Sequence, residues 1–158
     1  MSMDSGRPPG KELNVAAIRN GTVIDHIQNE ATFKVAEILR LPQSDQVVLV
    51  GMNLRSGRGG RKGIVKIEER ELTPQEVSTI ALIAPEATLN IIKDYQVAEK
   101  RRVQLPKRVE GIVRCFNPSC ITNCQAVPTC FDVLASSPVS LRCIYCERLM
   151  RGPDIVLK

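Results

Sequence analysis

The cysteines of this chain are confined to one part of it. All six lie between Cys115 and Cys146, and none precedes them. Clustered thiols form a disulfide framework in an oxidising compartment or bind a metal ion in a reducing one. Because residues 1–13 are polar and lack the apolar segment of an export signal, we expect a cytoplasmic protein whose thiols bind metal. The distribution therefore predicts two modules, of which only the C-terminal one is rich in cysteine.

The composition excludes several classes of protein. A chain of 158 residues has room for one ordinary domain or two small ones. Its 43% of hydrophobic and 25% of charged residues are typical of a globular protein, and no apolar run reaches the ~18 residues of a membrane-spanning helix. The net charge of +5 is mild, and the aromatic content of 3% is too low for a surface that stacks on bases. We therefore expect neither a membrane nor a nucleic-acid partner.

Alternating apolar residues and turn signals predict four strands in the N-terminal module. The strands are expected at residues 22–27, 46–54, 64–68 and 87–92. An amphipathic helix is predicted over 31–39, and a second helix begins at the capping box Thr73-Pro74-Gln75-Glu76 and ends before Pro85. The order β-α-β-β-α-β predicts an α+β, ferredoxin-like domain, in which two helices cover one face of an antiparallel sheet.

The other face of such a sheet remains open to a ligand or a partner. Alternation places Val65 and Ile67 on one side of their predicted strand and Lys66 on the other. Asn90 is likewise on the opposite side from Leu89 in the last predicted strand. Lys66 and Asn90 are thus turned away from the expected core, and we expect a small ligand to bind near them.

Charge and proline content indicate where the two modules meet. Residues 99–108 are charged and contain Pro106, so we expect a linker there. This places an N-terminal domain at 13–103 and a C-terminal domain at 104–158, behind a flexible tail at 1–12. The C-terminal segment shows short strands and turns around its cysteines, which predicts a small all-β domain. A domain of roughly 50 residues has a marginal hydrophobic core and needs a metal or a disulfide to hold it.

The spacing Cys115-x4-Cys120 and Cys143-x2-Cys146 is typical of a structural zinc site. Each pair can come from one tight turn, and four thiolates fill the tetrahedral shell of zinc without leaving a catalytic position. Spacing alone leaves the ligand set open, because Cys120-x3-Cys124 is also plausible and Cys130 is available as a further ligand. Cysteines outside the ligand set would act as small buried apolar residues. A zinc-ribbon protein that binds nucleic acid is the alternative interpretation of this module.

Two further patterns carry weaker signals. The loop at 57–63 (GRGGRKG), with Lys66 beyond it, combines glycines and cations as phosphate sites do. From spacing alone, a solvated and charged hairpin loop is the better explanation. The neighbours Asp25 and His26 resemble a catalytic couple, but no nucleophile motif accompanies them, and His26 taken alone is better interpreted as a structural histidine. We therefore predict no catalytic residue.

Several separated stretches together resemble one protein family. They are GTVIDHI at 21–27, Asn53-Leu54, Gly60-Arg61-Lys62, Lys66-Ile67-Glu68, Ala84-Pro85-x-Ala87-Thr88-x-Asn90, Tyr95 and the C-x4-C and C-x2-C pairs. From Leu13 to the C-terminus, the chain resembles the regulatory chain of aspartate carbamoyltransferase. The resemblance implies a non-catalytic subunit in pyrimidine biosynthesis that binds CTP, commonly with UTP, as inhibitor and ATP as activator. It also implies that regulatory homodimers bridge catalytic trimers and transmit the nucleotide effect to them.

The resemblance implies where the nucleotide binds. Contacts are implied at Ala17, Ile18, Val23, Asp25, His26, Lys66, Asn90, Ile92, Tyr95, Val97 and Lys100. Among them, Lys66, Lys100 and a partly charged His26 would lie near the phosphates. The N-terminal tail departs from the family pattern, so a second nucleotide site at Lys11 is left open.

The resemblance also selects residues in the C-terminal domain. One structural Zn2+ per chain is implied at Cys115, Cys120, Cys143 and Cys146. Cys124 and Cys130 are left outside this set. Contacts with the catalytic chain are expected beside the zinc turns, at Asn117, Tyr145 and Glu147.

Overall fold

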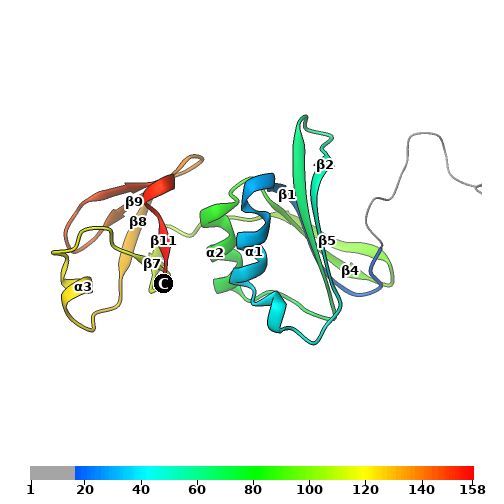
Figure 1. Cartoon of the computed structure of the whole chain (residues 1–158), viewed down its shortest axis with the longest axis horizontal. Coiled ribbons are helices and arrows are strands. Elements are labelled where there is room, and N and C mark those ends of the chain that lie inside the picture. The colour runs from blue at the N-terminus through cyan, green and yellow to red at the C-terminus, as the bar shows by residue number, and fades with distance from the viewer. Residues whose placement is uncertain (1–16) are drawn as a thin grey trace, which may run out of the picture.

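The structure is a computed structural model, and it describes residues 17–158. These residues are arranged in three layers (Figure 1). A five-stranded sheet forms the first layer, two helices pack on one of its faces, and the cysteine-rich domain lies on the far side of these helices. The expected tail at 1–12 and Lys11 lie outside the described residues. Among residues 17–158, no helix is long and apolar enough to cross a membrane.

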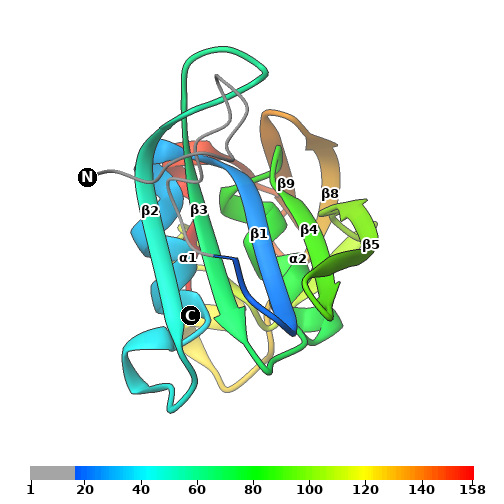
Figure 2. The same ribbon diagram turned by 90° about the vertical axis from the view of Figure 1, so that its right-hand side faces the viewer.

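The N-terminal sheet is antiparallel and has the strand order β2-β3-β1-β4-β5 (Figure 2). Its strands are β1 (Gly21–Gln28), β2 (Val48–Arg55), β3 (Arg61–Glu68), β4 (Thr88–Lys93) and β5 (Gln96–Arg102). The helices are α1 (Thr32–Ile38) and α2 (Pro74–Ile83), with short 3-10 turns at η1 (Asn29–Ala31) and η2 (Leu41–Gln43). The first four strands and both helices form the predicted β-α-β-β-α-β unit, so the ferredoxin-like prediction is confirmed.

Helix α2 begins at the predicted capping box. The Thr73 hydroxyl accepts a hydrogen bond from the Glu76 N–H at 3.1 Å, and the Glu76 carboxylate accepts one from the Thr73 N–H at 3.0 Å. These bonds satisfy amide groups that have no partner inside the helix, and Pro74 supplies a preset φ at the first helical position. The helix ends at Ile83, shortly before Pro85, because proline cannot continue it.

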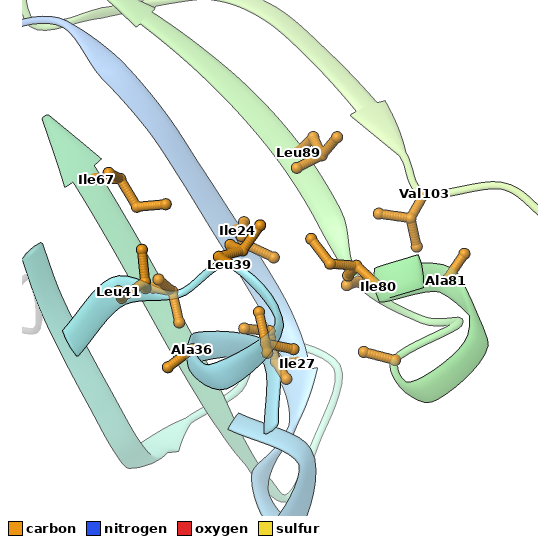
Figure 3. Packing of buried hydrophobic residues seen from close by; sticks show 14 residues of the cluster. Ile24, Ile27, Ala36, Leu39, Leu41, Ile67, Ile80, Ala81, Leu89 and Val103 are labelled. Atoms are coloured by element: carbon orange, nitrogen blue, oxygen red, sulfur yellow. The ribbon is translucent and has the colours of Figure 1, made fainter. Parts of the chain in front are cut away.

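The core of the N-terminal domain lies between the sheet and the two helices (Figure 3). Ile67 and Leu89 from the sheet and Ile80 of α2 belong to one cluster, and all three are almost fully buried. Full burial of one such side chain contributes roughly 1.5–3 kcal/mol to folding. Because side chains alternate along a strand, the same packing turns Lys66 and Asn90 to the opposite face of the sheet, as predicted.

The prediction of a linker at 99–108 is wrong for residues 99–102, because these residues belong to β5. This strand pairs with β4 along its length. All of its side chains are exposed, so it lacks the apolar alternation by which a strand is recognised in a sequence. The loop expected to continue to Gly63 is also shorter than predicted, since β3 already starts at Arg61.

The C-terminal domain is built mainly from short strands, as predicted. They are β6 (Arg108–Glu110), β7 (Val113–Arg114), β8 (Cys130–Ser136), β9 (Val139–Cys143), β10 (Leu149–Arg151) and β11 (Val156–Leu157). One sheet has the order β10-β9-β8-β6, β11 pairs with β7, and helical turns occur at α3 (Ile121–Cys124) and η3 (Gly152–Asp154). Phe131, Leu141 and Met150 are fully buried in the core of this domain. Leu82 of α2 joins the same core, so α2 contacts both domains.

Candidate metal centre and cationic sheet face

Four of the six cysteines converge in the C-terminal domain. The sulfur atoms of Cys115, Cys120, Cys143 and Cys146 all lie within 4.8 Å of one another. The Sγ atoms of Cys115 and Cys146 are 3.7 Å apart, and those of Cys120 and Cys143 are 3.8 Å apart. None of these thiols is in a disulfide, and only Cys146 is partly accessible. The fold therefore brings together both cysteine pairs that the sequence spacing singled out.

Two tight turns hold these cysteines. In the first turn, the Cys120 N–H donates to the Asn117 carbonyl at 3.0 Å, and the Asn117 side chain accepts from the Ser119 N–H at 3.1 Å. In the second turn, which follows β9, the Glu147 N–H donates to the Cys143 carbonyl at 2.9 Å. Each turn presents two sulfur atoms toward those of the other turn.

The donor set fits a tetrahedral metal ion. A tetrahedron with zinc–sulfur bonds of about 2.3 Å has edges of about 3.8 Å, which agrees with the sulfur separations observed here. Burial raises the pKa of the Cys115 thiol to about 12. At Cys146, burial also acts to raise the pKa, but hydrogen bonds from the Arg148 N–H and the Asn117 side chain help to lower it to about 7. A dication would displace the remaining thiol protons, because thiolates are the form that binds metal.

The two remaining cysteines lie outside this group. Cys130 is buried, and its Sγ is 3.8 Å from Oε1 of Glu110. Cys124 is exposed at the end of α3, with its Sγ 3.7 Å from the Pro118 carbonyl oxygen. The expectation that surplus thiols act as buried small residues fits Cys130 and is wrong for Cys124.

The sheet face opposite the helices carries a row of the predicted nucleotide residues. In the strand register, Val23 of β1 lies opposite both Lys66 of β3 and Asn90 of β4, and Asn90 lies opposite Lys100 of β5. Residues directly opposite each other in antiparallel strands point to the same side of the sheet. Figure 2 shows this side toward the viewer. We call it the cationic face and define it by Lys62, Lys66 and Lys100.

A bulge in β1 places Asp25 and His26 beside this row. The register between β1 and β3 shifts at this point, and His26 adopts a φ of 55°. One Asp25 carboxylate oxygen accepts a hydrogen bond from the His26 N–H at 2.7 Å and lies 2.8 Å from Nζ of Lys62. Nδ1 of His26 lies 3.1 Å from the hydroxyl oxygen of Thr88. The bulge thus joins one carboxylate, one ammonium and one imidazole in a single group.

Burial and the charges on this face together shift the pKa of Asp25 and of His26. Burial acts to raise the pKa of Asp25, but hydrogen bonds from Lys62 and the His26 N–H lower it overall. Burial lowers the pKa of His26, and the negative charge of Asp25 opposes this effect. The positive charges of Arg58, Lys62 and Lys100 lower the pKa of His26 further. His26 is therefore mainly neutral at pH 7.

An apolar patch adjoins the cationic face. The buried cluster on this side of the sheet consists of Ile18, Val23, Ile64 and Ile92. Ile92 lies opposite Val97, which is 56% exposed, and Tyr95 in the preceding turn is 66% exposed. Ala17 is exposed as well. The residues predicted to contact a nucleotide therefore form a surface with a charged end and an apolar end.

Comparison with known proteins establishes the family of the chain. Residues 13–104 match the family described as the allosteric domain of the aspartate carbamoyltransferase regulatory chain, and residues 107–156 match its metal binding domain. The chain belongs to the aspartate carbamoyltransferase regulatory chain family. The resemblance seen in the sequence motifs is thereby confirmed.

Relatives named as aspartate carbamoyltransferase regulatory chains match almost the whole length. That of Methanothermobacter thermautotrophicus is 51% identical over 154 residues, which are 97% of this chain and 97% of the relative. That of Porphyromonas gingivalis strain W83 is 50% identical over 147 residues, which are 93% of this chain and 97% of the relative. The Pyrococcus abyssi protein is 51% identical over 147 residues, at 92% and 97% coverage. The protein is therefore a regulatory and not a catalytic chain, and the enzyme's catalytic chain is its partner.

In this regulatory chain, the residues expected to contact the catalytic chain lie at the two metal turns. Tyr145 and Glu147 are exposed in the second turn. Asn117 is only 8% exposed, and its carbonyl accepts a hydrogen bond from the Asn123 side chain at 2.7 Å within the first turn. Tyr145 and Glu147 are thus accessible to a partner, whereas Asn117 mainly shapes the turn.

The cationic face of the regulatory chain includes Lys62, which the sequence placed in the loop of glycines and cations but not among the implied nucleotide contacts. Its side chain is only 19% exposed because it is held against Asp25. The signal for it was the period of two along β3, which puts Lys62 and Lys66 on the same face. The prediction missed the place of Lys62 on this face because it assigned residues up to Gly63 to the loop and not to the strand.

Proposed function

We propose that this regulatory chain binds nucleoside triphosphates on its cationic face and transmits their effect to the catalytic chain. CTP, together with UTP, inhibits the enzyme of pyrimidine biosynthesis, and ATP activates it. The observation that carries this proposal is the row Lys66, Val23, Asn90 and Lys100, which lies beside an apolar patch. Such a surface matches a ligand with several negative charges at one end and an aromatic base at the other.

The charged end of the site suits the phosphates. Lys66 and Lys100 flank Asn90 and Val23 in the row, and Lys62 lies near them, held by Asp25. Charge-assisted hydrogen bonds from ammonium groups to phosphate oxygens are stronger than neutral ones. A bound phosphate also favours the protonated form of His26, which then becomes a further donor.

The apolar end of the site suits the base and the ribose. Oδ1 of Asn90 is buried and has no hydrogen-bond partner within residues 17–158, so a donor on the ligand would satisfy it. Ile92, Tyr95 and Val97 frame the base, and backbone groups at Ala17 and Ile18 distinguish cytosine from adenine.

The four clustered cysteines hold one structural Zn2+ in this proposal. Bound zinc crosslinks the two turns and supplies no catalytic chemistry, since four thiolates leave no open position. Its role is to keep the metal-binding domain folded, and this domain presents Tyr145 and Glu147 to the catalytic chain, while Asn117 shapes the neighbouring turn. Thiols of this kind are maintained in the reducing cytoplasm, where we place the protein.

Regulation in this proposal is a shift between two states of the whole assembly. Regulatory homodimers bridge catalytic trimers, and each nucleotide stabilises the state to which it binds more tightly. The inhibitor and the activator thereby share one site and differ in which state they favour.

Nucleotide binding is tested by calorimetric titration of the metal-loaded chain with CTP and ATP. Lys66→Ala and Lys100→Ala should each weaken binding about 10- to 100-fold, the size of one charge-assisted hydrogen bond. Lys93→Ala is the matched control, because Lys93 alternates with Ile92 on β4 and lies on the other side of the sheet. Equal affinities in all three variants would contradict the proposed site.

Regulation is tested by mixing the chain with an aspartate carbamoyltransferase catalytic trimer and assaying activity with and without CTP and ATP. A complex that responds to both nucleotides supports the proposal. Absence of a complex, together with tight binding of oligonucleotides, would instead favour the zinc-ribbon interpretation.

A further inference from the structure

The two domains of the regulatory chain meet along α2 and the segment that follows β5. Leu82 packs into the core of the metal-binding domain, and Leu105 contacts the cores of both domains. Beside this apolar contact lies a cavity of about 400 Å3, lined by the α2–β4 loop, the end of β5 and the β8–β9 hairpin. The hairpin therefore does not pack closely against the allosteric domain at this point.

One side chain bridges this junction. Oε1 of Glu86, in the loop between α2 and β4, accepts a hydrogen bond from the hydroxyl of Ser137 at 3.1 Å. Ser137 lies in the turn of the β8–β9 hairpin. Oε2 of Glu86 accepts a hydrogen bond from Arg102 at 2.9 Å, and the Glu86 carbonyl accepts one from Arg58 at 3.2 Å. Three segments that are distant in sequence thus meet at Glu86.

Two of these partners belong to the side of the sheet where we propose that the nucleotide binds. Thr88 lies opposite both Asp25 and Arg102, so Arg102 points to the same side of the sheet as Asp25. Arg58 extends from the β2–β3 loop, and its charge contributes to the lowered pKa of His26. Both guanidinium groups are thus close to the cationic face.

We propose that Glu86 is a positioning residue that couples the cationic face to the β8–β9 hairpin, an inference that rests on the nucleotide binding proposed above. Phosphate oxygens bind guanidinium groups in charge-assisted, two-point contacts, so a triphosphate competes with Glu86 for Arg58 and Arg102. When Arg102 turns to the phosphates, Ser137 is left as the partner of the Glu86 carboxylate. The position of the hairpin then depends on whether a nucleotide is bound.

The contacts of Glu86 are suited to coupling more than to holding the fold. The side chains of Glu86 and Arg102 are 44% and 60% exposed, and exposed ion pairs contribute little to stability. We therefore expect substitution of Glu86 to leave the fold and the metal content intact. Coupling can then be measured separately from folding.

The test uses the metal-loaded chain assembled with an aspartate carbamoyltransferase catalytic trimer. For each variant, the Kd of CTP is measured, together with the ratio of activities with and without saturating CTP. In Glu86→Ala and Ser137→Ala, we expect the Kd to change by no more than about threefold, the effect of one exposed ion pair. The CTP effect on activity should fall to about half or less.

Two further variants sharpen the result. Glu86→Gln keeps an acceptor for Ser137 but loses the charge that holds Arg102, so its effect should be intermediate. Glu99→Ala is the matched control, because Glu99 is an exposed carboxylate of β5 that points to the other side of the sheet and pairs with Arg101 at 3.7 Å. This control should bind CTP and respond to it as the wild type does.

The outcomes separate this inference from the function on which it rests. A wild-type complex that neither binds CTP nor responds to it would overturn the proposed function. A wild type that binds and responds, with Glu86→Ala and Ser137→Ala responding equally well, would overturn coupling through Glu86. A loss of CTP affinity beyond about tenfold in Glu86→Ala would make Glu86 a binding residue and would also overturn the inference. The double variant should lose no more of the CTP effect than either single one, because both act through one hydrogen bond.

Discussion

The metal centre can be tested with two cysteine substitutions in the same domain. Cys143→Ser replaces a fully buried thiol whose Sγ lies 3.8 Å from that of Cys120 in the group of four. Cys124→Ser makes the same chemical change at an exposed thiol outside that group. We expect Cys143→Ser to lose the metal and unfold the metal-binding domain, and we expect Cys124→Ser to keep both the metal and the fold.

The expected magnitude follows from how strongly four thiolates hold zinc. A structural zinc ion contributes about 10–16 kcal/mol in small peptides near neutral pH. The entire unfolding free energy of a domain is about 5–15 kcal/mol, so loss of tight metal binding is enough to unfold this one. Cys124 is exposed, with its Sγ 3.7 Å from the Pro118 carbonyl oxygen, and its replacement should change the unfolding free energy by less than about 0.5 kcal/mol.

The assay combines metal analysis with thermal unfolding followed by circular dichroism. Wild type and Cys124→Ser should each carry one zinc per chain, and Cys143→Ser should carry none. The transition of the allosteric domain serves as an internal reference, because its core is built from residues outside the metal-binding domain. If the two variants behave alike, the assignment of Cys143 as a ligand is refuted.

Three further predictions concern the N-terminal domain. Gly63→Ala should lower the unfolding free energy by about 1–3 kcal/mol, because a Cβ there would lie 1.8 Å from Oγ1 of the buried Thr32, and denaturant unfolding measures the loss. Leu82→Ala should cost about 2–5 kcal/mol in the same assay, and an unchanged midpoint would show that α2 does not stabilise the metal-binding domain. CTP affinity should fall as pH rises. The pKa of His26 is lowered in the free chain, and a bound phosphate should raise it, so CTP binding should be accompanied by protonation of His26. Titrations between about pH 5.5 and 8.5 check this sign, and the same profile in His26→Gln would place His26 away from the phosphates.

Local patterns were sufficient for most elements of the N-terminal domain. The alternation of Val65, Lys66 and Ile67 predicts both a strand and its buried face, because successive side chains of a strand point to opposite sides. The Thr73 and Glu76 pair predicts the first residue of α2, because its hydrogen bonds span only one turn. Strand alternation and capping boxes involve only residues close together in the sequence, so they can be recognised without the tertiary structure.

Strand β5 could not be recognised in this way. It is held by backbone hydrogen bonds to β4, while all of its side chains are exposed, so its sequence resembles that of a linker. The error matters for the site, because β5 carries Lys100 and Val97 and aligns them with Asn90 and Ile92. Only the register of the two strands shows that these residues share one surface.

The sequence by itself determined the division into two modules, the order of the main elements and the cysteine spacing that selects a metal. These follow from composition and from short-range geometry. Only the tertiary structure decided that four sulfur atoms meet while Cys124 stays at the surface. It also decided that Lys62 pairs with Asp25 and that Glu86 reaches Ser137 in the other domain. The physical reason is that strand pairing and domain packing bring together residues that are far apart along the chain. A local sequence pattern does not specify which distant residue each of them contacts.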